Sequence, residues 1–435
     1  MEENNLEELV YTPQSLLDTD LYKFTMQNAI GHHFPETRAL YRFTHRDPDV
    51  LFPRRCIDLL HKSIQRFGDL RLTTEEKNWL ENTCPYFPKE YLEYLSGFRF
   101  NPAQISIRFN PVSEDGEEGK VEIEASGLWR ETILWEIPVM ACLSELYFRV
   151  GATDWSHEGQ KEIASAKAQA WLQAGCIFSE FGTRRRRSFY TQDLVVATLK
   201  QEADKSSGPG VFFGTCNPYF AKKYDIRVVG TIAHEWFMGV AALKGYEGAN
   251  TNALALWEET YPNSSLVAPT DTFSTRVFLQ ELAKDPARAE KWSGLRHDSG
   301  NPFEFAPAAK AMYESIGIDI RTKNIIYSDS LNSDKVLQLK KHCDEIGFGC
   351  SFGIGTNLTN DFKTKSSGYT EKSRALNMVI KLAKVDDKDC VKISDDLNKV
   401  QCTGDFPYAT LHFHPQNTGD KTLVAGVKKL YGIPN

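Results

Sequence analysis

The sequence has none of the marks of a secreted, disulfide-bonded or membrane-spanning chain. It contains nine cysteines, an odd number with no CxxC pair, which fits free thiols better than a disulfide framework. No apolar run reaches the length of a membrane span, and the first ten residues, MEENNLEELV, lack the basic and apolar stretches of a signal peptide. We therefore expect a soluble protein of a reducing compartment, located in the cytoplasm, with entry into the nucleus left open.

Acidic residues outnumber basic ones, so the formal net charge is -7 and the pI is about 5.9. A chain without a domain-wide positive field cannot release the counterions that bulk nucleic-acid binding requires. Four consecutive arginines nevertheless occur in EFGTRRRRS, residues 180–188. No aromatic-rich basic segment surrounds them to stack bases, so they indicate a local site for a small anion and no nucleic-acid surface.

The sequence shows no internal repeat and no low-complexity tract, and its composition is that of a globular protein. At 435 residues it is long enough for one large or two medium domains. Residues 1–150 mix helical patterns with the alternating segments ISIRF and VEIEASG, which predicts an N-terminal α+β domain. We expect residues 370–435 to complete that domain.

From residue 151 to 369, short buried strands alternate with helices in seven strand-to-helix units. The expected strands lie in CIFSEFG, VFFGT, RVVGT, SLVAPTDTF, WSGLRHDSG, KNIIYSDS and CSFGIGTN. Such units indicate a parallel sheet, and seven of them favour an irregular, incomplete seven-stranded parallel α/β barrel. Polar or glycine-rich residues follow each strand and would converge on the carboxyl-terminal face. One such segment could be an ordinary turn, but seven indicate a substrate site.

Two of these turns predict phosphate binding. Arginine forks match phosphate oxygens, but helical side chains turn by about 100° per residue, so the four arginines cannot all enter one pocket. We expect Arg184 to face the ligand, and at least two of the others to be solvated or packed against acidic side chains. Gly355 and Thr356, in FGIGTN, would let backbone amides approach a phosphate closely.

Two further turns carry carboxylates. RHDSG offers Arg296 for a second anion and Asp298 for ribose hydroxyls or Mg²⁺. Asp329, in IIYSDS, is a second candidate for ribose hydroxyls or metal. For either aspartate, a turn-capping role is the alternative.

His234, in GTIAHEWFMG, is the candidate nucleophile. A carboxylate on one ring nitrogen would fix the tautomer and make the other nitrogen more nucleophilic, and Asp271 follows the next strand. A phosphate-rich pocket makes phosphohistidine the expected adduct, whereas a buried core histidine is the alternative. Serine-hydrolase and zinc-protease chemistry are disfavoured, because neither GxSxG nor HExxH occurs.

These segments, together with SLLDTDLYKFTMQ near the start, resemble in order and spacing the fungal type of nicotinate phosphoribosyltransferase, from about residue 14 to the C-terminus. The resemblance implies a type II phosphoribosyltransferase fold. It also implies that nicotinate and 5-phosphoribosyl-1-diphosphate (PRPP) give nicotinate mononucleotide and diphosphate, the first step of NAD salvage from nicotinate. The family is ATP-dependent, of the ligase class, with ATP as co-substrate, Mg²⁺ as cofactor and coupling through a phosphohistidine.

The resemblance also implies roles for single residues. His234 matches the phosphorylated histidine, and Asp271 the acidic residue near it. The remaining matches are to ligand contacts: Thr231 and Arg296 to nicotinate, Tyr22 and Phe181 to the two faces of the pyridine ring, Arg184, Gly355 and Thr356 to PRPP phosphates, and Asp298 and Asp329 to ribose or Mg²⁺. In dimeric members the tyrosine comes from the partner subunit, so a homodimer is one expectation.

Asn217, in GTCN, lies where related nicotinamide enzymes carry an aspartate that accepts from the amide. A neutral side chain there would not repel the nicotinate anion, so we interpret Asn217 as selecting the acid, with a plain turn residue as the alternative. A phosphoribosyltransferase for nicotinamide or quinolinate and an inactive paralogue that binds NAD intermediates are the competing functions. Asn217, His234 and the otherwise intact motifs argue against them.

Two features depart from the family pattern. Asn301 stands where an aspartate usually ends RxDSGD, which leaves the number of bound Mg²⁺ ions open. Residues 400–416, VQCTGDFPYATLHFHPQ, have no recognised counterpart. The segment begins with Val and ends with Gln, which GTN and CAG codons can encode, and these are the signals at the two ends of an intron. We interpret it as a retained or mis-annotated intron without function, with a genuine lineage-specific loop as the alternative.

Overall fold

The computed structural model describes residues 10–230, 232–264, 266–395 and 419–434, and the chain divides into two compact units. The first unit contains Met1–Thr231, Leu331–Leu337 and Ser351–Lys381, and the second contains Ile232–Ser330, Gln338–Cys350 and Leu382–Asn435. Thr231 and the suspected insertion at 400–416 lie outside the described residues. The domain boundaries expected at residues 150 and 369 stay a prediction.

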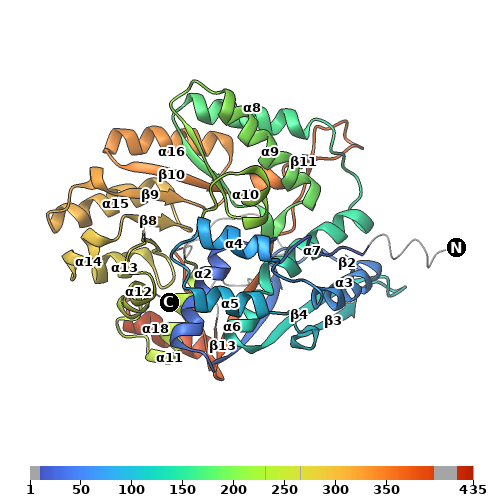
Figure 1. The fold of residues 1–435 in the computed structure, drawn as a ribbon, viewed down its shortest axis with the longest axis horizontal. Coiled ribbons are helices and arrows are strands. Elements are labelled where there is room, and N and C mark those ends of the chain that lie inside the picture. Colours follow the sequence, from blue (N-terminus) through green and yellow to red (C-terminus); the bar gives the residue numbers. More distant parts are fainter. Residues whose placement is uncertain (1–9, 231, 265, 396–418, 435) are drawn as a thin grey trace, which may run out of the picture. The chain divides into compact units, whose positions relative to one another are not determined.

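The first unit begins with an antiparallel sheet covered by helices. Strand β4 (Glu118–Leu128) pairs with β1 (Arg38–His45), β2 (Phe52–Pro53) and β3 (Ile105–Pro111). Along β4 exposed and buried side chains alternate, and the buried face carries Val121, Ile123 and Ala125. Figure 1 shows α3 (Arg54–Phe67) beside β3 and β4, against which it packs its apolar face. The α+β pattern expected for these residues is confirmed.

This part of the first unit contains further helices. They are α2 (Leu21–His33), α4 (Thr74–Thr83), α5 (Lys89–Gly97), η1 (Pro102–Gln104), α6 (Trp129–Thr132) and α7 (Glu136–Val150). A capping box begins α4, because Thr73 and Glu76 each accept from the other's backbone N–H. Helix α7 buries nearly every side chain, which makes it the central helix of the unit.

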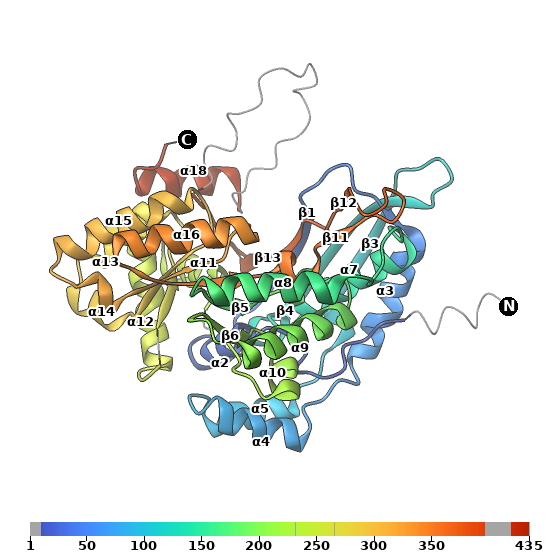
Figure 2. The same ribbon diagram turned by 90° about the horizontal axis from the view of Figure 1, so that it is seen from above.

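Parallel strands form the second part of the first unit. Strand β5 (Ile177–Glu180) pairs in parallel with β6 (Val211–Thr215) and with β10 (Gly349–Ile354). Helix α8 (Gln160–Gln173) packs against α9 (Phe189–Lys205), as Figures 1 and 2 both show. The remaining elements are η2 (Thr183–Arg185), α10 (Pro218–Tyr224), α17 (Thr356–Thr359), β11 (Phe362–Lys363) and β12 (Lys372–Ser373).

The strand expected at residues 227–231 is wrong for the described residues 227–230. They form one isolated parallel bridge, between Val228 and Thr215. A Cβ on Gly214 would lie 2.0 Å from the carbonyl oxygen of Arg227, so the two backbones meet at a single close approach that only glycine allows. Gly230, with φ 140°, then takes the chain out of the strand conformation. The other six expected strands are found.

The second unit is also of α/β type. Strand β8 (Gly294–His297) pairs in parallel with β7 (Val267–Pro269) on one side and β9 (Asn324–Tyr327) on the other. Its further elements are α11 (His234–Lys244), α12 (Ala249–Thr260), α13 (Thr275–Leu282), α14 (Pro286–Lys291), α15 (Pro302–Ser315), η3 (Ile320–Thr322), α16 (Ser333–Ile346), β13 (Met378–Val385), β14 (Lys388–Asp389) and α18 (Lys421–Leu430), of which α16 and β13 each have part of their residues in the first unit. The predicted α/β class with parallel strands is confirmed.

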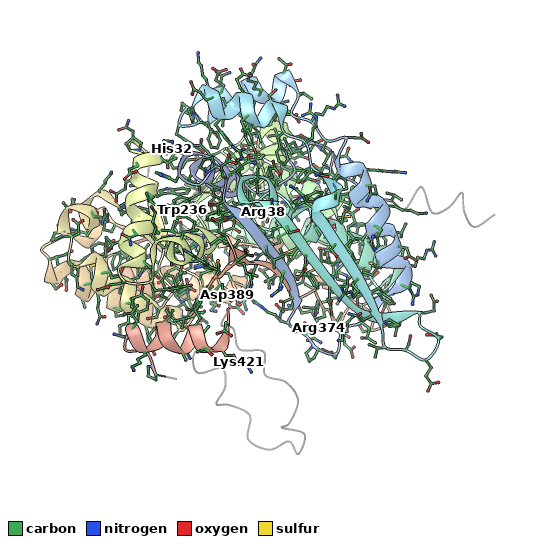
Figure 3. The ribbon with its side chains drawn as sticks, turned by 90° about the horizontal axis from the view of Figure 1, so that it is seen from below. His32, Arg38, Trp236, Arg374, Asp389 and Lys421 are labelled. Carbon is green, nitrogen blue, oxygen red and sulfur yellow. The ribbon has the colours of Figure 1, made fainter. Side chains whose placement is uncertain are left out.

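Buried aromatic contacts hold the helices of the second unit together. Figure 3 labels Trp236 on α11, whose indole Nε1 donates to the carbonyl oxygen of Ala253 on α12 at 2.9 Å. The ring of Trp236 also meets that of Trp257 edge to face. These contacts fix the start of α11, where His234 lies. No helix in the described part of the chain combines the length and apolar character that crossing a bilayer requires.

Candidate active site

His234 is the first residue of α11, and its imidazole lies among polar side chains of the second unit. Nδ1 lies 3.0 Å from the hydroxyl oxygen of Thr272. Nε2 lies 2.9 Å from Asp298 Oδ2 and 3.5 Å from Asp271 Oδ1. Both ring nitrogens therefore have polar neighbours, and the predicted pairing of His234 with Asp271 is present, with Asp298 closer still.

The two aspartates come together because they follow neighbouring parallel strands. Asp271 comes after β7 and Asp298 directly after β8, and the register pairs Pro269 with Arg296. Asp271 Oδ2 accepts from the hydroxyl of Ser299 at 2.6 Å and lies 3.0 Å from Lys392 Nζ. Carboxyl ends of parallel strands meet at one edge of a sheet, which is where ligands bind in such folds.

Asp298 is held from three sides. Its Oδ1 accepts from the hydroxyl of Ser328 at 2.7 Å, and Oδ2 lies 3.4 Å from Arg296 Nη2 in addition to its contact with His234. Arg296 Nη1 donates to the carbonyl oxygen of Ile232 at 3.2 Å, which orients the guanidinium. One oxygen of Asp298 is thus shared by two cationic or proton-donating partners.

The ionisation of the cluster follows from burial and these partners. Burial lowers the pKa of His234, and the Lys392 ammonium lowers it further, so the imidazole is neutral at neutral pH. Burial alone would raise the pKa of Asp271, but Lys392 and His234 outweigh it and the pKa is lowered. For Asp298, Arg296 and the hydrogen bond from His234 likewise outweigh burial and hold the pKa well below its usual range. The site is a neutral imidazole between two carboxylates.

Sequence reasoning missed four of these polar side chains: Thr272, Ser299, Ser328 and Lys392. The first three sit directly beside predicted residues, in TDTF, HDSG and YSDS, so their position after a strand was a usable signal. Lys392 follows β14 and has no local signal, because only the tertiary fold brings it to Asp271. Of the other predicted residues of this unit, Asp329 follows β9, is partly exposed and accepts from the hydroxyl of Ser330 at 2.8 Å.

The four consecutive arginines belong to the first unit and have different environments. Arg186 is fully buried, and its guanidinium binds both oxygens of Asp18 at 2.7 Å. Arg187 is also fully buried, with its guanidinium carbon 3.6 Å from the centre of the Phe148 ring. Arg186 is packed against an acidic side chain as expected, whereas Arg187 is buried among aromatic rings.

The other two arginines are partly exposed. Arg185 Nε donates to the carbonyl oxygen of Met378 at 2.9 Å. Arg184 Nη1 donates to Glu136 Oε1 at 3.1 Å, and 36% of its side chain is exposed. Glu136 also pairs with Lys23, and these two cations outweigh its burial and lower its pKa. Arg184, the arginine that we expect to face the ligand, therefore keeps part of its surface accessible.

Four of the remaining predicted residues of the first unit are partly exposed, and Asn217 is buried. Tyr22, at the start of α2, and Phe181, directly after β5, are partly exposed, as are Gly355 and Thr356 at the N-terminus of α17. Phe181 lies beside the end of β10, since its backbone N–H donates to the carbonyl oxygen of Ile354 at 2.8 Å. A Cβ on Gly355 would come within 3.2 Å of the Phe181 carbonyl oxygen, so a larger residue would fit only if this oxygen moved by a few tenths of an ångström.

Asn217 is fully buried and its amide is engaged on both sides. Its Oδ1 caps α10, accepting from the backbone N–H of Tyr219 at 3.0 Å and of Phe220 at 3.3 Å. Its Nδ2 donates to Asp18 Oδ1 at 2.9 Å and to the hydroxyl of Thr183 at 3.3 Å. Asn301 is likewise the N-cap residue of α15, where Oδ1 accepts from the backbone N–H of Phe303.

Known proteins resemble this chain in both sequence and fold. The model of the nicotinate phosphoribosyltransferase (NAPRTase) family matches residues 176–435, and that of the NAPRTase N-terminal domain matches residues 17–144. A nicotinate phosphoribosyltransferase of Saccharomyces cerevisiae is 39% identical over 427 residues, which cover 96% of this chain and 95% of the relative. One of Methanosarcina acetivorans is 40% identical over 402 residues, covering 89% of this chain and 94% of the relative.

The solved structures agree with the sequence comparison. A crystal structure of nicotinate phosphoribosyltransferase from Porphyromonas gingivalis superposes with a TM-score of 0.84 at 33% identity, covering 97% of this chain and all of the other, 100%. The two family models together match residues in both units, and the relatives are of nearly equal length. Both comparisons therefore indicate the same family. The chain belongs to the nicotinate phosphoribosyltransferase family.

Proposed function

We propose that the protein joins nicotinate to PRPP, giving nicotinate mononucleotide and diphosphate, and couples this reaction to ATP hydrolysis through a phosphohistidine at His234. Membership of the family supports the transfer reaction. The observation that supports the coupling is the neutral imidazole at the start of α11, between Thr272 and two carboxylates. A buried histidine with only a structural role would not need two ionised aspartates on one nitrogen.

The tautomer follows from these contacts. A bare lone pair on Nε2 would face two carboxylates, so the proton lies on Nε2 and is donated to Asp298, with Asp271 alongside. The lone pair is then on Nδ1, which accepts from the Thr272 hydroxyl until the phosphoryl donor binds. Attack of this nitrogen on the terminal phosphorus of ATP forms a P–N bond and breaks the bridging P–O bond, so ADP leaves. The carboxylates stabilise the positive charge that the ring gains, and water later hydrolyses the P–N bond.

In the transfer step the pyridine nitrogen attacks the anomeric carbon of PRPP as diphosphate leaves. Arg296 is suited to hold the nicotinate carboxylate, Tyr22 and Phe181 the ring, and Arg184, Gly355 and Thr356 the phosphates. Asp298 and Asp329 follow β8 and β9, whose register pairs His297 with Tyr327, so their oxygens suit a hard cation such as Mg²⁺. Bound Mg²⁺ would neutralise charge on the leaving diphosphate.

Several finer points belong to the same proposal. Thr231 contacts nicotinate in the proposed scheme, and the parallel strands belong to an incomplete barrel of the type II phosphoribosyltransferases. A second copy of the chain supplies Tyr22. Asn217 acts on base choice indirectly: its buried amide keeps a neutral group beside Asp18, where an aspartate would add a second carboxylate.

The test is the formation of nicotinate mononucleotide from nicotinate, PRPP and Mg²⁺, with and without ATP, and with nicotinamide in parallel. We expect product from nicotinate only, and a rate that ATP raises. His234→Asn should abolish the stimulation by ATP and the acid-labile ³²P label from γ-labelled ATP, whereas the matched variant His342→Asn, on α16, should keep both. Unchanged ATP coupling in His234→Asn would refute the phosphohistidine, and product from nicotinamide would refute the base assignment.

A further inference from the structure

The ligand atoms of three side chains around His234 lie close enough to share one ion. His234 Nε2 is 2.9 Å from Asp298 Oδ2 and 3.5 Å from Asp271 Oδ1, and one atom of each residue lies within 4.8 Å of the other two. Two donors at the usual zinc distances are about 2.9 Å apart at a right angle and about 3.3 Å apart at the tetrahedral angle. The two separations from Nε2, 2.9 and 3.5 Å, are close to those expected for neighbouring donors on one metal ion.

A second, independent observation points to a missing partner. Asp271 Oδ1 is buried, since only 1% of the side chain is exposed, and it has no hydrogen-bond partner among the described residues. A buried carboxylate oxygen without a partner costs free energy, and this one faces Nε2. A cation between the three donors would satisfy it.

The surrounding groups orient all three donors. Ser299 and Lys392 hold the other oxygen of Asp271, and Ser328 holds the other oxygen of Asp298. With a metal on Nε2 the ring proton moves to Nδ1, from which it can be donated to the Thr272 hydroxyl at 3.0 Å. Metal-bound histidines usually donate their second N–H in this way.

Charge sets the strength of such a site. Two carboxylates attract a dication, but Lys392 Nζ lies 3.0 Å from Asp271 and Arg296 Nη2 lies 3.4 Å from Asp298. These cations offset the two negative charges, so binding should be moderate and should tighten when one cation is removed. One imidazole nitrogen and two carboxylate oxygens suit a borderline transition cation better than Mg²⁺, which prefers oxygen alone.

We propose that His234, Asp271 and Asp298 form a binding site for a zinc-type divalent cation, which inhibits the enzyme by occupying the histidine before it can be phosphorylated. Binding itself needs only the three side chains, whereas the inhibition rests on the proposed phosphohistidine. Bound Zn²⁺ takes Nε2 and leaves Nδ1 protonated, so neither nitrogen keeps a lone pair for the phosphoryl group. The ATP-stimulated part of the rate should be lost, whereas the ATP-independent part should fall less, because it needs Asp298 but no phosphohistidine.

The first measurement is calorimetric titration of the full-length protein with ZnCl₂, without ATP, PRPP or Mg²⁺. We expect one site of micromolar affinity that weakens at least tenfold in Asp271→Asn and in His234→Asn, with folding of each variant checked by circular dichroism. His342→Asn is the matched control and should bind as the wild type does. Lys392→Gln should bind about tenfold more tightly, since it removes a cation beside the ligand.

Cobalt distinguishes this site from the cysteines. Co²⁺ bound by nitrogen and oxygen donors gives visible d–d bands without the near-ultraviolet thiolate band, and the eight described cysteines are buried free thiols. Zinc affinity that is unchanged in both Asp271→Asn and His234→Asn, or a Co²⁺ spectrum dominated by thiolate, would overturn the site. Zinc that binds as expected but leaves ATP stimulation intact would overturn the inhibition, and because the titration needs no ATP it does not depend on the proposed phosphohistidine.

Discussion

Glu180 ends β5 at the turn that carries Phe181 and Arg184, and its carboxyl group is completely buried. Its Oε1 accepts from the backbone N–H of Gly182 and from Gln192, and its Oε2 accepts from the hydroxyl of Thr215 and from Gln192. Burial outweighs these donors and raises the pKa of Glu180 from 4.5 to about 7. We therefore expect this one carboxyl group to make the stability of the protein depend on pH.

The sign follows from proton binding. Below about pH 4.5 Glu180 is protonated in both the folded and the unfolded state. Between pH 4.5 and about 7 only the unfolded chain loses this proton, so the free energy of unfolding falls as the pH rises, and above about 7 the contribution is lost. At about 1.4 kcal/mol per pH unit, that interval corresponds to about 3.5 kcal/mol.

Glu180→Gln removes the titrating group and keeps its size. Urea unfolding of wild type and variant at pH 5.0, 6.0 and 7.5, followed by near-ultraviolet circular dichroism, gives the difference between their free energies of unfolding. We expect wild type to lose about 2.5 kcal/mol relative to the variant between pH 5.0 and 7.5. The control is Glu93→Gln, since Glu93 is exposed and pairs only with Lys77 in the described structure. A wild-type-to-variant difference that stays constant across the three pH values would refute the reasoning.

Three further outcomes are expected. Arg186→Met should lower the free energy of unfolding by about 3–5 kcal/mol, because it leaves the Asp18 carboxylate buried without its cation. Arg187→Met should cost less than about 2 kcal/mol, because no carboxylate in the described part of the chain faces Arg187, and equal losses in urea titrations would contradict this. Asn217→Asp should cost about 2–4 kcal/mol at pH 7.5 and less at pH 5, because it sets a second carboxylate at the 2.9 Å contact with Asp18; thermal unfolding at both pH values checks the sign. A variant lacking residues 400–416 should keep the wild-type rate of nicotinate mononucleotide formation within about twofold, and a large loss would make the segment a working loop.

The alternation of strands and helices could be predicted because burial of each strand leaves a short apolar run between helical patterns. Six of the seven expected strands are present in the described residues. The segment RVVGT fails because its apolar run looks like a strand. Its pairing is a single bridge at Val228, beside the close approach that Gly214 allows, and the positive φ of Gly230 ends the extended conformation. A single close approach between backbones leaves no periodic trace in the sequence.

The site could be predicted as far as its residues follow strands. Asp271 and Asp298 come together because the ends of the parallel strands β7 and β8 share one edge, which the pattern of turns already implied. His234 meets them from the start of α11, although the segment before it forms no strand. Lys392 could not be found in this way, since it follows an antiparallel hairpin and meets Asp271 only through the tertiary fold. The proposed cation site at His234, Asp271 and Asp298 could not be predicted either, because the separations of 37 and 27 residues between them match no metal-binding motif.

The arginine run shows why a charge pattern alone cannot identify a ligand site. Arg186 is neutralised by Asp18, 168 residues away, and no carboxylate among the described residues pairs with Arg187, so half of the apparent positive charge serves the interior of the first unit. Arg184 has one hydrogen bond to Glu136 among the described residues and keeps about a third of its side chain exposed, so donors of its fork stay available for an anion. What separates a ligand-binding arginine from a structural one is the number of its donors that the protein leaves unused, and that number is set by partners far away in the sequence.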